Sequence, residues 1–184
     1  MMHTIEDIEQ EKLRVLSRPS PQAAPPVLCF FAIRPVVPVE EYQARLRAVL
    51  GPALELAATQ SFDDELPEDS IPGWFAAVCG RSSTTVPDFA RRGAEHYRTA
   101  REGGRWELQE WLDQFDPESE FRGWAWWDLT RSPDGSVKVW VDTWGESFFA
   151  CDELRWLAFV AGADRVTGPE LARIDGWHEA ATAE

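Results

Sequence analysis

The residues most able to bind a partner or to do chemistry are tryptophans and carboxylates that gather in the middle of the chain. Eight of the ten tryptophans fall between Trp106 and Trp156, and the same window holds twelve Asp or Glu residues against four Arg or Lys. An indole ring is either a large core filler or a rigid anchor for a partner. The candidate site residues in this window are Trp124, Trp126, Asp128, Trp140, Asp142, Trp144 and Glu146.

The alternation of side chains along a strand places these residues on one face of a predicted β-hairpin. Two runs of aromatic and β-branched residues, 121–130 and 136–143, flank the turn sequence R-S-P-D-G. The apolar face of this hairpin is predicted to carry Ala125, Trp127, Leu129, Val137, Val139, Val141 and Thr143. The opposite face mixes indoles with charges, as the aromatic anchors and polar rim of a recognition surface do.

The mixed face has two interpretations. In the first, the rings are exposed: Trp126, Trp140 and Trp144 anchor a partner, while Asp128, Asp142 and Glu146 steer it electrostatically. In the second, a helix of the same chain, such as the one predicted at 106–115, covers the rings and leaves the charges at the edge. Each ring carries about 150 to 250 Å² of surface, so several rings left in water without a partner would favour aggregation.

An enzymatic interpretation of the same residues is the alternative to binding. Asp128, Asp142 and Glu146 could supply the two carboxylates of a glycoside hydrolase, and the neighbouring indoles could stack on sugar rings. Two acids near a turn are common in proteins, so the spacing carries little specificity. A third interpretation is a structural subunit in which the aromatic face pairs with a second copy of the chain.

No catalytic residue, metal site or cofactor is predicted. Cys151 falls near the start of a predicted helix, where the dipole would lower the pKa of a thiol, but two acids follow it, and a buried structural thiol is expected. The acidic run at 62–70 lacks the ordered spacing of a calcium loop. The three histidines, His3, His96 and His178, lack the short spacings of zinc ligands.

The net charge of −14 restricts the partners that the protein can bind. A strongly acidic surface disfavours nucleic acid and attracts basic proteins. The sequence has neither a secretory leader pattern nor a run of about 18 apolar residues, so neither secretion nor a membrane span is expected. The three cysteines, Cys29, Cys79 and Cys151, lie in apolar surroundings and are expected to be reduced, which is typical of a cytoplasmic protein.

The elements that must position these residues predict an α+β fold. An N-terminal helix and a proline-rich linker occupy 1–26, and a single α+β domain occupies 27–184. The linker would leave the first helix only loosely attached. The domain is expected to have a small, mostly antiparallel sheet, with four to five helices packed mainly on one face.

Hydrophobic periodicity and capping signals set the expected elements. Strands are predicted at 27–33, 121–130 and 136–143, and a short buried strand at 74–79. Helices are predicted at 4–16, from 38 to a C-terminal cap at Gly51, and at 87–101, 106–115, 151–162 and 169–173.

Together these features favour a non-enzymatic, acidic protein-binding module that captures a basic partner through its tryptophan-bearing and aspartate-bearing face. Inhibitors and immunity proteins of bacterial toxins are of this general type: small, acidic, cytoplasmic and aromatic at the interface. This chain resembles them only in these general properties, and its residues do not place it in a family.

Overall fold

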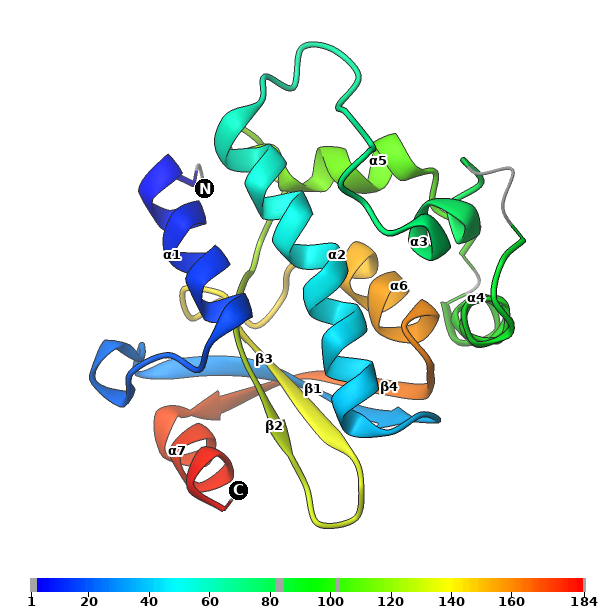
Figure 1. Ribbon diagram of the computed structural model, residues 1–184. Coiled ribbons are helices and arrows are strands. Elements are labelled where there is room, and N and C mark those ends of the chain that lie inside the picture. The colour runs from blue at the N-terminus through cyan, green and yellow to red at the C-terminus, as the bar shows by residue number, and fades with distance from the viewer. Residues whose placement is uncertain (1–2, 82–84, 102, 184) are drawn as a thin grey trace.

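The fold is built on a four-stranded antiparallel sheet with the strand order β2-β3-β1-β4 (Figure 1). The computed structural model describes residues 3–81, 85–101 and 103–183. The strands are β1 (Val27–Pro35), β2 (Ala125–Arg131), β3 (Val137–Asp142) and β4 (Ala163–Arg173), and each neighbouring pair is antiparallel. The α+β class and the small antiparallel sheet predicted from the sequence are confirmed.

Seven α-helices are present in the described residues, and two of the seven have six residues or fewer. Six of them lie in the domain at 27–184, where four to five were expected. The seven helices are α1 (Ile5–Leu16), α2 (Val39–Thr59), α3 (Gly73–Val78), α4 (Asp88–Arg101), α5 (Leu108–Leu112), α6 (Asp152–Val160) and α7 (Ile174–Thr182). Helices α1 to α6 lie on one side of the sheet and α7 lies on the other (Figure 1). Most of the helices therefore share one side, as predicted.

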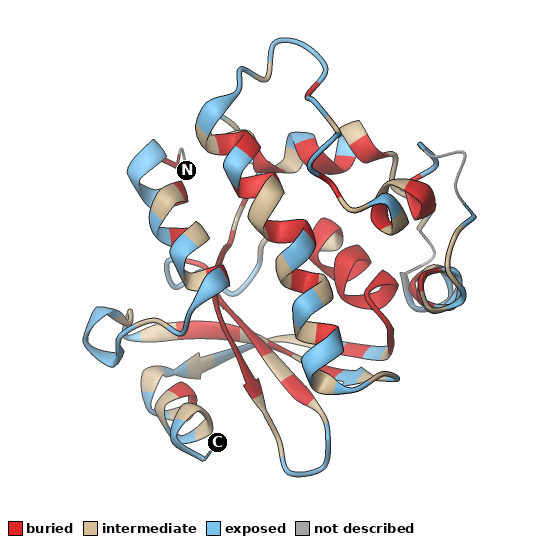
Figure 2. Ribbon diagram, in the orientation of Figure 1, coloured by how far each residue is buried: buried red, intermediate tan, exposed pale blue. Residues whose placement is uncertain are grey.

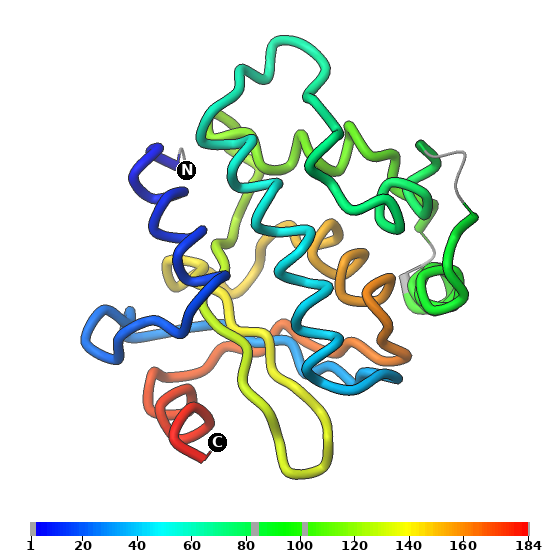
Figure 3. Tube along the Cα trace, viewed as in Figure 1, coloured from blue at the N-terminus to red at the C-terminus, as the bar shows by residue number. Residues whose placement is uncertain are grey.

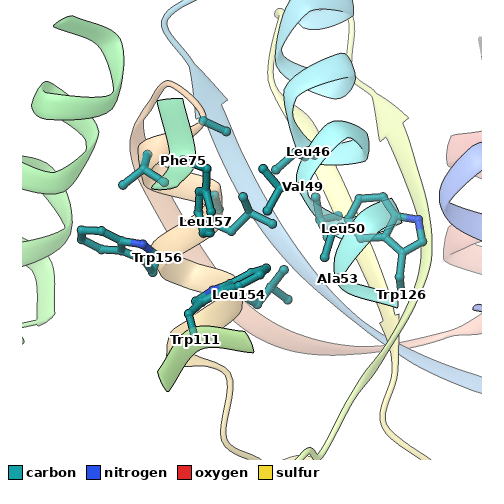
Figure 4. Close-up of a cluster of buried hydrophobic side chains, with 14 of the residues drawn as sticks. Leu46, Val49, Leu50, Ala53, Phe75, Trp111, Trp126, Leu154, Trp156 and Leu157 are labelled. Atoms are coloured by element: carbon teal, nitrogen blue, oxygen red, sulfur yellow. The ribbon is translucent and has the colours of Figure 1, made fainter. Parts of the chain in front are cut away.

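The larger core lies between the sheet and the helices on that side. Helix α2 places Leu46, Val49 and Leu50 toward the sheet, because residues three and four apart share one face of a helix. Figure 4 shows these side chains between Trp126 of β2 and Leu157 of α6. The sheet, α2 and α6 thus form one continuous apolar interior.

Helix α1 packs firmly on the rest of the molecule. Thr4 and Asp7 form a capping box that satisfies free backbone groups at its start. Ile8 and Val15 are fully buried, against α2 and the edge strand β2. The loose attachment suggested by the proline-rich segment is therefore wrong, since the buried stripe of α1 fixes it to the body.

Helix α2 is longer than its sequence signals predict. It continues through Gly51 and Pro52 to Thr59, so Gly51 is not its C-terminal cap. Ala53, Leu54, Leu56 and Ala57 all lie in the core. The burial of this extra apolar face outweighs the local helix-breaking tendency of a Gly-Pro pair.

Two short segments adopt the opposite structure from the one predicted. Residues 73–78 form helix α3 rather than a strand. The prediction failed because the hydrophobic periodicity of a six-residue apolar run does not distinguish a helix from a strand. Residues 169–173 belong to β4 rather than to a helix. Pro169 is tolerated there because β4 is an edge strand, where a missing N–H need not break a ladder.

Candidate functional site

Three of the four tryptophans among the candidate site residues, two of them predicted anchors, are buried inside the protein. Trp124, Trp126 and Trp140 are 0%, 2% and 1% exposed. Figure 2 shows that almost the whole of β2 is buried. The expectation that these three rings stand in solvent is therefore wrong, and none of them can contact a partner in this structure.

A β-bulge explains why strand alternation misplaced two of the rings. Trp126 pairs with Val141, whereas Asp128 pairs with Trp140, so β2 carries one extra residue, Trp127, at this point. The extra residue reverses the side on which earlier residues of β2 lie. Trp126 consequently joins the core face beside Val141, and Trp127 lies with Trp140 on the other face.

The C-terminal helix α7 covers the second face of the hairpin. Trp177 of α7 is fully buried and forms a small cluster with Trp127, Trp140 and Leu28. The Trp127 and Trp177 rings meet edge to face, with their centroids 5.7 Å apart. Coverage by a helix of the same chain, the alternative interpretation, is thus what the structure shows, although the helix is α7 rather than the one at 106–115.

Asp128 is a structural residue within this cluster. Its Oδ2 accepts hydrogen bonds from Trp177 Nε1 at 3.0 Å and from Arg18 Nε at 2.8 Å. Burial raises the pKa of Asp128, although these two donors and the Arg18 charge oppose the shift. Its carboxylate therefore holds α7 and the N-terminal segment to the sheet, and both of its donors are groups of the same chain.

Glu153, near the start of α6, holds two further tryptophans in place. Its carboxylate accepts a hydrogen bond from Trp124 Nε1, and its carbonyl oxygen accepts one from Trp111 Nε1 at 3.0 Å. Burial raises the pKa of Glu153. Cys151, at the helix cap beside it, is also buried, and burial raises the pKa of its thiol. The expected burial of this thiol is confirmed, and a raised pKa opposes formation of a nucleophilic thiolate.

The three carboxylates proposed for a hydrolase lie in different settings. Asp128 belongs to the buried tryptophan cluster, whereas Asp142 is half-buried and accepts a hydrogen bond from the Trp144 amide at 2.9 Å. Burial raises the pKa of Asp142. Glu146 is exposed and lines a cavity of about 390 Å³ that neither aspartate lines. Glu146 thus shares this cavity with neither of its proposed partners.

Trp144 is the one predicted anchor whose ring reaches solvent, and a tight turn presents it. Its φ is +53° and that of Gly145 is +84°, and the Glu146 amide donates to the Thr143 carbonyl at 3.0 Å. Asp142 accepts from the Trp144 amide and fixes the start of the turn. The indole is 41% exposed and packs edge to face against His3, with centroids 5.1 Å apart.

Two further exposed rings lie beside Trp144. Phe121 is 79% exposed and Phe148 is 95% exposed, and with Trp144 they are the strongly exposed aromatic residues in the described part of the chain. All three line the cavity of about 390 Å³, together with Phe149, Glu120 and Glu146. We call this cavity the aromatic groove. It lies between the segment that enters β2 and the segment that leaves β3, which Figure 3 traces in yellow-green and yellow.

Sequence reasoning missed Phe121 and Phe148 as site residues. Phe121 was assigned to a strand, but β2 begins only at Ala125. Phe148 follows the hairpin in the segment G-E-S-F-F-A, where an aromatic pair stands outside any periodic pattern. Large apolar residues in a loop of this kind are the signal that could have identified them.

The surface beside the aromatic groove is acidic. A neighbouring cavity of about 700 Å³ is lined by Asp63, Asp116 and Glu118. The two cavities are lined by consecutive parts of the segment 116–123. Arg122 also contributes to the aromatic groove, but its side chain is 1% exposed and points into the protein. The groove therefore lies within a surface of negative charge.

A buried ion pair fixes α1 behind the groove. Arg122 Nη2 donates to Glu11 Oε1 at 2.5 Å, and both side chains are 1% exposed. The guanidinium also lies over the rings of Phe115 and Trp124, 4.7 and 4.8 Å from their centroids. Burial and the Arg122 charge lower the pKa of His3, whose Nε2 lies 3.3 Å from the Arg122 carbonyl oxygen.

The N-terminal segment also covers the free edge of β2. Glu11 Oε1 accepts from the Trp126 amide at 2.6 Å, and Arg14 Nε donates to the Trp126 carbonyl at 2.9 Å. Arg18 donates to the Leu129 carbonyl at 3.2 Å. These side chains satisfy outward backbone groups that an edge strand would otherwise offer to another strand. The edge of β2 is thus occupied at Trp126 and Leu129.

The residues that the structure describes contain no group of three or more His, Cys, Asp or Glu placed to hold a metal ion. No helix among them combines the length and the apolar character that crossing a bilayer requires. Comparisons of the chain with protein-family models, with curated proteins and with solved structures find no match.

Proposed function

We propose that the protein is a non-enzymatic, acidic binding module that captures a basic protein partner through the aromatic groove. The main evidence is that the strongly exposed aromatic rings of the described structure all line one cavity. They are Phe121, Trp144 and Phe148. A cluster of exposed aromatic residues in one cavity indicates an interaction site, whereas single exposed rings scattered over a surface do not.

The charge of the molecule supports a basic partner. The chain carries a net charge of −14, and Glu120 and Glu146 lie in the groove itself. Long-range attraction would raise the rate of encounter with a cationic surface, and desolvation of the rings would then supply affinity. The same charge disfavours nucleic acid as the partner.

The backbone at Trp144 gives further support. A bulky residue at a φ of +53° is uncommon, and glycine or asparagine would fit the position with less strain. Strain of this kind costs about 1 to 3 kcal/mol and concentrates at functional positions. A strained, 41% exposed indole at this position fits a role in binding.

The residues predicted for the site divide into contact residues and residues that support them. Trp144 and Glu146 remain contact residues, and Asp142 holds the turn that presents Trp144. The buried members, Trp124, Trp126, Asp128 and Trp140, stabilise the sheet from which the groove loops emerge.

We further propose that the module acts in a reducing compartment such as the cytoplasm, in the manner of an inhibitor or immunity-type protein. All three cysteines are free and buried, including Cys79, whose pKa burial raises to about 12. Thiols of this kind are typical of proteins that do not depend on disulfides.

The experiment is affinity capture from the native host with the tagged protein, in low salt and in about 0.5 M salt, followed by titration of the captured protein after purification. We expect a basic protein that is retained in low salt and released in high salt. The test variant is Phe148→Ser, since this ring is 95% exposed and its removal should not disturb folding. The matched control is Leu171→Ser, on the edge strand β4, where the side chain is 52% exposed.

Binding that is lost in Phe148→Ser and kept in Leu171→Ser would support the proposal. A partner that binds both variants equally would contradict it. Light scattering of the protein alone supplies a second check, because a dimer that Phe148→Ser dissociates would show that the groove binds a second copy instead.

A further inference from the structure

We propose, on the basis of the binding function proposed above, that the aromatic groove receives an arginine side chain of the partner. The groove combines the flat faces of exposed rings with two carboxylates, Glu120 and Glu146, in a cavity of about 390 Å³. Arginine is the side chain that matches both features, because its planar guanidinium stacks on rings and pairs with carboxylates through a fork of donors.

The carboxylates of the groove are available for such a ligand. Within the described residues, neither Glu120 nor Glu146 forms an ion pair with the protein's own cations. Arg122 is the cationic residue among those that line the groove, and its guanidinium is held by Glu11 on the far side. The groove therefore presents two carboxylates that no cationic side chain of the described residues pairs with.

The rings favour a guanidinium over a compact ammonium ion. Phe121 and Phe148 are mostly exposed and Trp144 is 41% exposed, so their rings offer surface for stacking. A weakly hydrated planar cation loses less hydration on stacking than the lysine ammonium does. The same combination occurs inside this protein, where Arg122 lies over the Phe115 and Trp124 rings and pairs with Glu11. The groove lines its cavity with the same kinds of group, aromatic rings and carboxylates.

The test uses three synthetic peptides that are identical except at one central position, which is arginine, lysine or citrulline. Citrulline has nearly the shape of arginine and carries no charge. The readout is the NMR signal of the Trp144 indole N–H in the full chain, compared with that of Trp74, which lies on α3 away from the groove. We expect saturable shifts at Trp144 with the arginine peptide, binding about three- to tenfold weaker with lysine, and none with citrulline.

Two pairs of variants separate specific binding from general attraction to an acidic protein. Glu146→Gln should weaken binding of the arginine peptide about three- to tenfold, whereas Glu179→Gln, the same charge change on α7, should not. Phe148→Leu removes the π face but keeps an apolar side chain, so it should also weaken arginine binding. Leu171→Ile on β4 is the control for that change.

The outcomes distinguish this inference from the function on which it rests. Equal binding of the citrulline or the lysine peptide would overturn the arginine assignment, as would equal effects of Glu146→Gln and Glu179→Gln. If no peptide shifts the Trp144 signal while partner capture still depends on Phe148, the arginine site is wrong and the binding function stands. If capture is also insensitive to Phe148, both fail.

Discussion

The buried ion pair between Glu11 and Arg122 makes the docking of α1 testable. Replacing Glu11 with methionine leaves the Arg122 guanidinium, 1% exposed, without its counter-charge, and leaves the Trp126 amide without its acceptor. Breaking a buried pair from one side costs about 3 to 5 kcal/mol. We therefore expect Glu11→Met to lower the free energy of unfolding by about 4 kcal/mol, a large share of the roughly 5 to 15 kcal/mol typical of a domain.

The double variant Glu11→Met/Arg122→Met should recover much of this loss. Three atoms of the pair, Glu11 Oε2 and Arg122 Nε and Nη1, are buried without a hydrogen-bond partner among the described residues, so the pair is imperfectly satisfied. Two well-packed apolar side chains are often as stable as a buried pair. The Trp126 amide remains unpaired at a cost of about 1 to 3 kcal/mol, so we expect the double variant within about 2 kcal/mol of the wild type.

The assay is urea denaturation of the wild type, both single variants and the double variant, with free energies from linear extrapolation. The double-mutant cycle should give a coupling energy of at least about 2 kcal/mol. Additive effects, with Glu11→Met costing less than about 1 kcal/mol, would refute the reasoning and mean that α1 does not bury this pair.

Three further predictions test the packing around the site. Trp177→Ala should cost about 3 to 5 kcal/mol of unfolding free energy by uncovering the second face of the hairpin, and a change below about 1 kcal/mol would contradict that coverage. Gly93→Ala should destabilise the protein in thermal denaturation although alanine favours helices by about 1 kcal/mol, because the new Cβ would lie 2.0 Å from the Phe159 carbonyl oxygen. Burial raises the pKa of Glu153 above its ordinary 4.5, so wild-type stability falls as pH rises from that value through the folded-state pKa. The stability of Glu153→Gln relative to the wild type should therefore grow between about pH 4 and pH 7, and a constant difference would contradict the shift.

Elements with local signals were predicted well from the sequence. The capping box of Thr4 and Asp7 starts α1 where expected, and apolar periodicity located α4 and α6. These signals depend on residues within one or two turns of one another, so a linear sequence displays them. The end of α2 was mispredicted because its continuation past Gly51 depends on burial against other elements.

The sides on which the hairpin residues lie were only partly predicted from the sequence. Alternation placed Asp128 and Leu129 correctly but reversed Trp126 and Trp127, since a bulge between Trp126 and Asp128 changes the phase. A bulge leaves no clear mark in a run of aromatic residues. The covering helix α7 was also missed, although its apolar residues follow a helical spacing and pack in the small cluster around Trp127 and Trp140. These residues are Ile174, Trp177, Ala180 and Ala181.

The amino-acid sequence by itself determined an acidic, tryptophan-rich chain with an antiparallel hairpin in an α+β fold. Those properties follow from composition and from contacts between near neighbours. Only the tertiary structure decided which rings reach solvent. Trp177 covers the hairpin by bonding to Asp128, 49 residues away in the chain, while Trp144 escapes coverage because its turn projects it beyond the end of β3. Exposure depends on such long-range contacts, which no local pattern encodes.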